Sequence, residues 1–422
     1  MVPDPLKSRA NCSSGWPLVI LGVIAVAGGF VHQNAGAVAV GLLLVAGPLT
    51  VHALLRRAIR DLHFERRAPE SAFEGDSLDV VVCVENRSRL PLFHPVVSDC
   101  FAPELHAQKD VLFPDRILPG EAVEMAYHGA CLLPRGIYKL GPLSVTLSDP
   151  FGWFQMRRVL EDELPFKVYP AVEKLTAKEE LGRCLTEILS ELTQRSLGES
   201  KEFVWVRDYQ RGDPLRRIHW GLTAHRGQPV VREFANHVAG DLHIFVDRYR
   251  DALMGIGRAS SLEHSVKIAA GLSSHALSRG HRVQLAAGTE DGFHVPAASG
   301  TRQLHEVLEV LVALKPHDSE RLADTLEAFA HLVRPGSTAV MMISPYAYED
   351  SRILSQMRRW KERGVRVVAI IFDAATFRRL WSQPLPETAS REYVERLSTG
   401  GIKAYLLPCA ADLQAVLAGE AA

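Results

Sequence analysis

The sequence predicts a multidomain protein: a pair of apolar N-terminal helices, then a small β-sandwich, then an α/β Rossmann-like domain. Three patterns predict this order. Two nearly charge-free apolar runs come first, a stretch of alternating residues between Pro and Gly turns comes second, and apolar strands alternate with helices in the last part. A chain of 422 residues is also too long for one ordinary core. The predicted domains are residues 1–61, 62–169, 170–239 and 240–422.

Two transmembrane helices are expected in the first domain, at about 16–33 and 35–55. A bilayer-spanning helix needs about 20 apolar residues, which the second run supplies alone and the first supplies with its flanks. Small residues recur four apart, and this spacing lets two helices approach closely in lipid. They are Ala25 with Gly29, and Ala37 with Gly41. The predicted structure is a transmembrane hairpin.

Two other interpretations of this region remain. Lys7 and Arg9 precede an apolar stretch, and Ala25-Val26-Ala27 resembles a cleavage site, as in a secretory signal peptide. The second interpretation is a helical hairpin buried in the core of a soluble protein.

Arginines crowd the end of the second apolar run, which marks that side as cytoplasmic. These are Arg56, Arg57, Arg60, Arg66 and Arg67. The expected location is the inner (plasma) membrane, with two passes, contact with the lipid bilayer and the soluble domains in the cytoplasm.

Period-two alternation predicts the β-sandwich of residues 62–169. Leu78, Val80, Val82 and Val84 fall on one face of a strand, and Pro- and Gly-containing turns separate further short strands. A helix at about 177–194 is expected to link this domain to the next one.

Strands and helices alternate after residue 240, which predicts a parallel sheet covered on both faces. The expected strands are 242–246, 283–287, 338–343 and 365–372, with a short strand in the tail. The expected helices are 261–277, 302–314, 320–333 and 351–363.

Composition excludes several classes of protein. Lys and Arg number 48 against 49 Asp and Glu, a balance that argues against a nucleic-acid binder. The six cysteines form no Cys-x-x-Cys pair, so the sequence predicts neither a zinc site nor a disulfide framework. It contains no Walker or Gly-x-Gly-x-x-Gly pattern and predicts no oligomeric state.

The most distinctive segment is the run from Arg207 to Phe234, rich in arginine and aromatic residues. Gly212-Asp213-Pro214 is a turn signal within it, because Gly permits positive φ and Pro fixes φ. Several arginines and a histidine there can donate hydrogen bonds that Asp213 and Glu233 can accept.

This run resembles the signature of the bacterial and archaeal family called domain of unknown function 58. One position departs from the pattern, since His225 stands where the family has arginine. The segments 134–142, 149–154 and 168–170 also agree with the family. The matching residues of the run are Arg207, Tyr209, Gly212, Asp213, Arg216, Ile218, His219, Trp220, Thr223, Ala224, Arg232, Glu233 and Phe234.

The resemblance implies a von Willebrand factor type A-like domain after residue 240. Such domains bind a divalent metal through Asp-x-Ser-x-Ser after the first strand, where ligands of open α/β sheets lie. Here that position reads Asp247-Arg248-Tyr249-Arg250-Asp251, with both serines replaced, and Ser344 comes directly after a later strand. Asp247, Asp251 and Ser344 are the candidate ligands for Mg²⁺ or Ca²⁺, but hard cations prefer more oxygen ligands. No working metal site and no cofactor are predicted.

The signature run has a catalytic interpretation and a structural one. Asp213 and His219 could form an acid–base pair, with Thr223 or Tyr209 as the nucleophile. Alternatively, the charged groups form a hydrogen-bonded cluster that fixes a loop or a docking surface, with Trp220 packed underneath.

The expected function is that of a non-enzymatic, membrane-anchored protein-binding module. The resemblance implies a partner, a MoxR-type AAA+ ATPase, of which this chain would be an adaptor or target in envelope-complex assembly or a stress response. Arg207, Asp213, Arg216, His219 and Trp220 would shape the docking surface. The alternatives are a membrane-face hydrolase that uses Asp213 and His219, and a divalent-metal-dependent binding domain.

Overall fold

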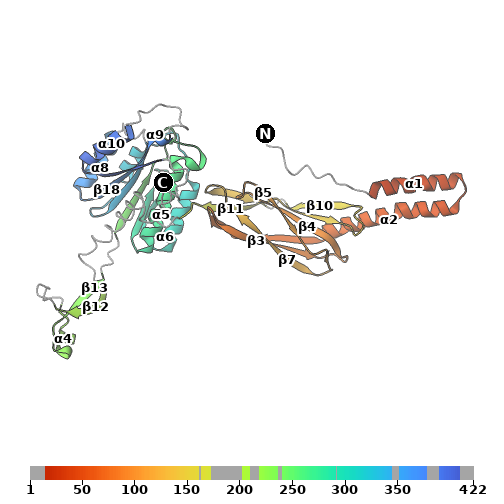
Figure 1. Cartoon of the computed structure of the whole chain (residues 1–422), viewed down its shortest axis with the longest axis horizontal. Helices are drawn as coiled ribbons and strands as arrows, with labels where there is room; N and C mark the ends of the chain where they lie inside the picture. Colours follow the sequence, from red (N-terminus) through yellow and green to blue (C-terminus); the bar gives the residue numbers. More distant parts are fainter. Residues whose placement is uncertain are drawn as a thin grey trace. The chain divides into compact units, whose positions relative to one another are not determined.

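A computed structural model describes most of the chain, and a division between Val168 and Tyr169 separates two compact units (Figure 1). The predicted helix at 177–194 lies outside the described residues, as do Gly212, Asp213 and Arg216. The structure describes residues 15–160, 163–172, 202–209, 218–235, 240–290, 292–344, 351–377 and 389–408.

The first unit begins with two apolar helices, α1 (Gly15–Val31) and α2 (Ala35–Arg60). Only α2, among the described helices, is long and apolar enough to cross a membrane; α1 is apolar but shorter. The Asn34 side chain caps α2 by accepting a hydrogen bond from the Ala37 amide at 3.1 Å.

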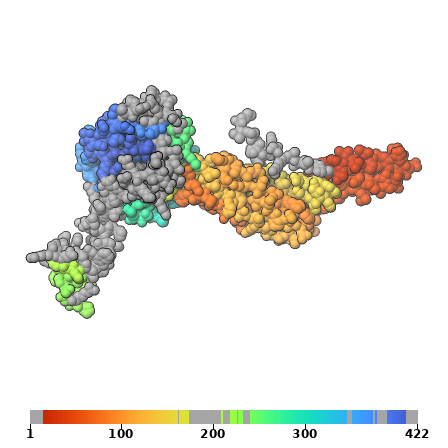
Figure 2. All heavy atoms as spheres, viewed as in Figure 1, coloured from red at the N-terminus to blue at the C-terminus, as the bar shows by residue number. Residues whose placement is uncertain are grey.

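The two helices lie side by side, and their side chains fill the space between them (Figure 2). Glycines permit this approach. A Cβ on Gly41 would lie 2.7 Å from Val26, and one on Gly29 would lie 2.7 Å from Val38, both too close. Gly29 and Gly41 are two of the small residues whose spacing predicted close packing.

Helix α2 continues five residues beyond the predicted end at 55. Leu55, Ala58 and Ile59 explain the extension, because they are buried in the same hydrophobic core as the strands of the first unit. The arginines between them lie on the exposed side of the helix.

Two sheets complete the first unit. A three-stranded antiparallel sheet has the order β1 (Leu62–Arg67), β3 (Ser77–Asn86), β7 (Ala122–Ala130). The second sheet has the order β10 (Gln155–Leu160), β9 (Leu143–Ser148), β4 (Leu92–Phe101), β8 (Gly136–Leu140), β11 (Leu164–Tyr169), β2 (Ser71–Phe73), and β5 (Ala107–Leu112) and β6 (Arg116–Ile117) also pair with β4.

Side chains from both sheets enter one core. Val80, Val82 and Val84 of β3 are fully buried and alternate with more exposed neighbours, which confirms the predicted period of two in this strand. They share the cluster with Val97 of β4 and Phe166 of β11.

The second unit contains a six-stranded sheet. Its pairings are parallel except at one edge, where β16 runs antiparallel to β15. The prediction of a wholly parallel sheet was therefore wrong at that edge. The order is β16 (His294–Ala298), β15 (Arg282–Ala286), β14 (Asp241–Val246), β17 (Thr338–Ile343), β18 (Arg366–Phe372), β19 (Lys403–Leu407).

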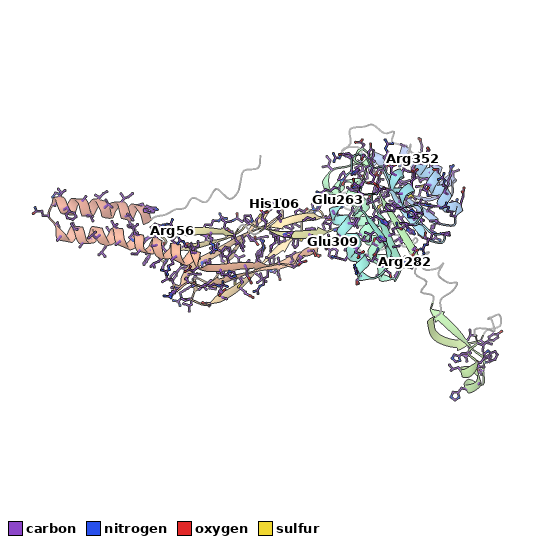
Figure 3. All side chains as sticks on the ribbon, turned by 180° about the vertical axis from the view of Figure 1, so that it is seen from behind. Arg56, His106, Glu263, Arg282, Glu309 and Arg352 are labelled. Carbon is purple, nitrogen blue, oxygen red and sulfur yellow. The ribbon has the colours of Figure 1, made fainter. Side chains whose placement is uncertain are left out.

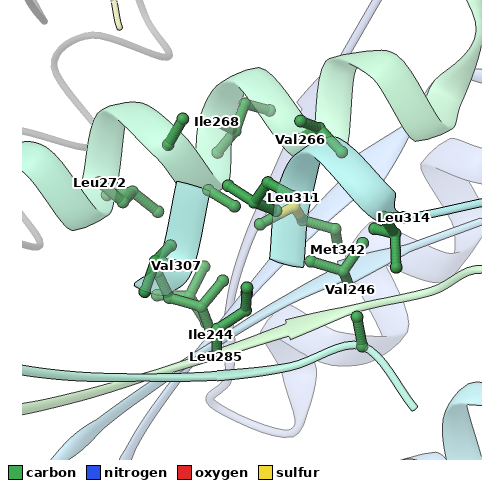
Figure 4. Close-up of a cluster of buried hydrophobic side chains, with 14 of the residues drawn as sticks. Ile244, Val246, Val266, Ile268, Leu272, Leu285, Val307, Leu311, Leu314 and Met342 are labelled. Carbon is green, nitrogen blue, oxygen red and sulfur yellow. The ribbon is translucent and has the colours of Figure 1, made fainter. Parts of the chain in front are cut away.

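Helices cover both faces of this sheet, as the buried strands predicted. Residues on the face that includes Ile244 pack with α5 (Ser261–Ser278) and α6 (Thr301–Ala313), and Figure 4 shows this cluster. Phe245, the next residue along β14, points to the opposite face and stacks on Trp360 with ring centroids 5.3 Å apart. That face is covered by α7 (Leu322–Ala328), α8 (Ser351–Glu362) and α10 (Ala389–Thr399).

Short elements complete the second unit. Helix α7 is much shorter than the predicted helix at 320–333. The remaining elements are β12 (Glu202–Asp208), α4 (Trp220–Arg226), β13 (Val230–Ala235), α9 (Ala374–Phe377), and the 3-10 turns η4 (Arg250–Ala252) and η5 (Gly257–Ala259).

Candidate functional site

The backbone of the signature run forms a two-stranded antiparallel ladder between β12 and β13. Arg207 pairs with Val231, Val206 with Arg232, and Trp205 with Glu233. The ladder therefore places three of the predicted site residues, Arg207, Arg232 and Glu233, at neighbouring register positions. Gly212, Asp213 and Arg216 fall between the two strands in sequence, outside the described residues.

His219 is the N-cap residue of helix α4. Its Nδ1 accepts a hydrogen bond from the Leu222 amide at 3.2 Å, which satisfies one of the free N–H groups of the first turn. Its own amide donates to the Val230 carbonyl at 2.8 Å. The Nδ1 atom of His219 is therefore occupied by a hydrogen bond from the backbone.

Thr223 and Tyr209 are also tied to the backbone of this turn. Thr223 Oγ1 accepts a hydrogen bond from the Val230 amide at 3.1 Å, and the Tyr209 amide donates to the Pro229 carbonyl at 2.9 Å. Gly227 ends α4 with φ of 70°, a left-handed conformation that suits glycine. These contacts define a compact helix and strand that hold each other in place.

Trp220 is the exposed residue of this segment. The sequence interpretation packed it underneath a charged cluster, but 66% of its surface is exposed. Ile218, Val230 and Val231 fill the interior instead. Trp220 occupies the first position of α4, directly after the His219 cap, so the indole is presented outward from an ordered turn.

The second group of predicted residues lies at the carboxyl edge of the six-stranded sheet. Asp247 comes directly after β14 and Ser344 directly after β17, and these strands are parallel neighbours. Both residues are buried, at 3% and 1% exposure. The topology therefore brings Asp247 and Ser344 to the same edge of the sheet.

Asp247 is a buried carboxyl group. Burial raises its pKa to about 7, opposed by a hydrogen bond from the Tyr249 amide to Oδ1 at 3.0 Å. Asp251 is exposed and accepts a hydrogen bond from the Tyr249 hydroxyl at 3.0 Å.

A buried arginine, Arg248, dominates the same edge. Its guanidinium donates to Glu320 at 2.5 Å and to Glu290 at 3.1 Å, and it lies 4.2 Å from the centroid of the Phe293 ring. Gly288 leaves room for it, because a Cβ there would lie 2.5 Å from Arg248 Nη2. A fixed cation with its own carboxylates therefore lies next to the predicted metal position.

Glu290 extends the hydrogen bonds of Arg248 to the protein surface. Its hydrogen bond from Arg248, together with nearby His317, holds the pKa of Glu290 below its usual value. His317 Nε2 lies 3.0 Å from the other carboxylate oxygen, and His317 Nδ1 accepts a hydrogen bond from the Glu320 amide at 3.0 Å.

These residues do not fit a divalent metal. Mg²⁺ and Ca²⁺ require several oxygen ligands, mostly carboxylates. Within the described ranges, no group of three or more His, Cys, Asp or Glu side chains could hold an ion. The carboxylates of Glu290 and Glu320 are paired with Arg248.

The sequence interpretation did not find the Arg248 network. Its members come from positions 248, 290, 317 and 320, which no local spacing connects. A local signal was an arginine two residues beyond a largely buried strand, a position that in this fold class points toward the ligand edge.

The fold and this edge define the class of the second unit: an open α/β sheet with polar residues collected at the carboxyl ends of its strands. Residues 205–375 match the family model described as "Protein of unknown function DUF58". This range includes β13, the Arg248 network and every strand of the six-stranded sheet except β19.

Curated relatives are distant. The uncharacterized protein YeaD of Bacillus subtilis is 23% identical over 313 residues, 70% of this chain and 74% of that protein. UvrABC system protein B of Thermotoga maritima is 25% identical over 264 residues, 59% of this chain but only 38% of that protein.

The chain also shows low similarity to parts of several solved structures. The putative ApaA protein of Bordetella pertussis aligns over 26% of this chain and 94% of that chain, with 15% identity and a TM-score of 0.18. A β-glucosidase of Listeria innocua aligns over 26% of this chain and 16% of that chain, with 14% identity and a TM-score of 0.16.

Proposed function

We propose that this chain is a membrane-anchored protein-binding module that docks an AAA+ ATPase of the MoxR type. It would act as adaptor or target in the assembly of envelope complexes or in a stress response. The observation that carries this proposal is Trp220, two-thirds exposed at the start of an ordered helix. Rigid exposed tryptophans are the side chains that most often anchor protein interfaces, because they bury a large apolar area with little loss of conformational entropy.

The anchor is α2, joined by α1 as a second span. Arg56, Arg57 and Arg60 are exposed at the end of α2, and basic residues at the end of a span favour the cytoplasmic side. We therefore place both units of the chain in the cytoplasm, at the inner membrane. The two sheets of the first unit would form a β-sandwich, and the six-stranded sheet would form a von Willebrand factor type A-like domain.

Binding through this domain would not depend on a metal. The buried guanidinium of Arg248 already occupies this sheet edge, and its carboxylate partners Glu290 and Glu320 are engaged with it. The cap made by His219 also supports binding rather than catalysis, because its Nδ1 is committed to the Leu222 amide.

The test is co-purification from mild detergent extracts with the nucleotide of the ATPase replaced by a slowly hydrolysed analogue. Wild type is compared with Trp220→Ala and with Ile256→Ala, a control that truncates another exposed apolar residue of the same unit, 69% exposed. We expect the ATPase to co-purify with wild type and with the control.

Loss of a central interface tryptophan costs about 2 kcal/mol or more, so Trp220→Ala should retain roughly thirtyfold less ATPase. The proposal fails if no AAA+ ATPase accompanies the wild type, or if Trp220→Ala retains as much as Ile256→Ala.

A further inference from the structure

An apolar groove of about 260 Å³ lies in the first unit, where α2 meets the second sheet. Leu54, Leu55 and Ala58 of α2 form one wall. The start of β4, including Phe93, and the loop after β9, including Phe151, form the other. The groove is open, since Leu54 is 49% and Phe151 is 64% exposed.

The loop that carries Phe151 is held in shape by Asp149. This buried carboxylate accepts hydrogen bonds from the Phe151 amide at 2.8 Å and the Phe154 amide at 2.5 Å. Gly152 comes next with φ of 71°, and Phe151 stacks on Trp153 with ring centroids 4.7 Å apart. The exposed Phe151 is therefore part of an ordered loop, one of the segments that also carries the family resemblance.

The groove lies at the depth of a membrane surface. From Ala35 to His52, α2 is about 27 Å long at 1.5 Å per residue, close to the roughly 30 Å of a hydrocarbon core. Trp16 lies beside His52, with ring centroids 5.8 Å apart, and tryptophans gather at membrane interfaces. The groove residues of α2 lie within two turns of His52.

Basic side chains of α2 lie at the same level along the helix as the groove. Arg56, Arg57 and Arg60 are exposed on the sides of α2 that do not line the groove, and Figure 3 shows Arg56 where the helix meets the sheets. At this depth the helix therefore has an apolar groove on one side and cations on the others. This combination matches the boundary between acyl chains and headgroups.

We infer that the groove binds one acyl chain of a bilayer phospholipid. The inference rests on the proposed membrane anchorage. The walls are apolar apart from Ser148 and Asp149, and both oxygens of Asp149 already accept backbone amides, so little in the groove would orient a polar ligand. The volume is also below the roughly 300–1,000 Å³ of ordinary small-molecule pockets, which suits a single chain segment.

The test uses the full chain in nanodiscs that contain phosphatidylglycerol with a photoreactive diazirine on one acyl chain. After illumination, labelled peptides are mapped by mass spectrometry. We expect labelling of residues 90–93 and 147–151, which belong to the sheet side of the groove, in addition to the lipid-facing surfaces of α1 and α2.

Leu54→Trp fills the groove from its open side, and Leu49→Trp adds the same ring to the same helix outside the groove, at 42% exposure. Leu54→Trp should reduce labelling of both sheet segments at least fivefold, and Leu49→Trp should leave it unchanged. If Leu54→Trp does not fold, Phe151→Ser, which removes an exposed wall, should give the same loss.

Labelling confined to α1 and α2, or equal labelling of the sheet segments in the groove variants and in wild type, would overturn the inference. Retention in membranes after alkaline carbonate extraction reports the anchorage separately. A wild type that is released by carbonate contradicts the proposed function itself, whereas a retained protein with unlabelled sheet segments contradicts only the groove.

Discussion

Among the described residues, each unit of the molecule contains a buried arginine paired with a carboxylate, and these two pairs differ in what surrounds them. Arg66 and Asp99 lie 2.7 Å apart with side chains 3% and 0% exposed. Arg248 and Glu320 lie 2.5 Å apart with side chains 4% and 8% exposed. By distance and burial alone, the pairs are equivalent.

The first pair is closed by its own sheets. The Tyr127 hydroxyl donates to Asp99 at 2.6 Å, and Arg66 also donates to the Leu140 carbonyl at 2.8 Å. Burial raises the pKa of Asp99, and the Arg66 charge opposes this most strongly. The partners come from β1, β4, β7 and β8, so this pair ties the two sheets together.

The second pair opens to the surface through Glu290, whose side chain is 54% exposed. It also lies at the carboxyl edge of a parallel sheet, where such folds bind ligands. Burial of an ion pair therefore does not by itself identify a functional site. Position in the fold and a route to solvent distinguish the two.

The largest effect is expected from Asp99→Asn. It removes the buried carboxylate that lies 2.7 Å from the Arg66 guanidinium, which costs about 3–5 kcal/mol of unfolding free energy. Hydrogen exchange of β3, β4 and β7 in detergent should show faster opening, with exchange in β14 and β17 unchanged. The double variant Arg66→Met, Asp99→Leu should recover most of the loss. A single variant as stable as wild type would mean that the pair does not join the sheets.

A smaller effect is expected from Glu320→Gln. Arg248 keeps Glu290 as a charged partner, and glutamine can still accept a hydrogen bond, so the cost should be about 1–3 kcal/mol. Hydrogen exchange should rise around β14 and β15 alone. If Glu320→Gln lowers the unfolding free energy as much as Asp99→Asn does, the Arg248–Glu320 pair is as isolated from solvent as the Arg66–Asp99 pair.

Asp247 adds a pH dependence to the second unit. Its folded pKa of about 7 lies above the usual carboxyl value, so the folded state holds the proton more tightly than the unfolded chain. The unfolding free energy should therefore fall as pH rises from about 4 to about 7, by about 2 kcal/mol between pH 5 and pH 7. Asp247→Asn should remove this slope in denaturant titrations. A slope that persists in the variant would assign it to another group.

The smallest effect is expected from Arg250→Ala. It removes an ion pair with Asp318 whose side chains are 61% and 72% exposed, and such pairs contribute about 0–1 kcal/mol. The melting temperature should change by no more than a few degrees. A larger change in melting temperature would mean that the exposed Arg250–Asp318 pair, as well as Arg248, stabilises the carboxyl edge of the sheet.

Elements with uniform burial could be predicted from the sequence. The strand Thr338–Ile343 matches its predicted bounds because all six residues are buried, giving an unbroken apolar run. Strand β16 was missed because Pro296 interrupts its pattern; at a sheet edge a proline is tolerated, since one side of the strand needs no hydrogen bonds.

The candidate sites could be predicted only in part. Asp247 and Ser344 come directly after apolar strands, so parallel topology alone brings them to one edge. The partners of Arg248 could not be predicted, because Glu290 and Glu320 come from loops far along the chain. The exposure of Trp220 depends on Ile218 and Val231 filling the interior, which composition cannot specify.

One contact in the first unit has a mechanical consequence. Arg158 of β10 donates to the carbonyls of Ile59, Arg60 and Leu62, which are the end of α2 and the start of β1. These hydrogen bonds therefore fix the C-terminal end of α2 to strand β10. If α2 spans a membrane as proposed, a bilayer thinner than its apolar length would tilt the helix, and these hydrogen bonds would pass the tilt to the sheet as torque.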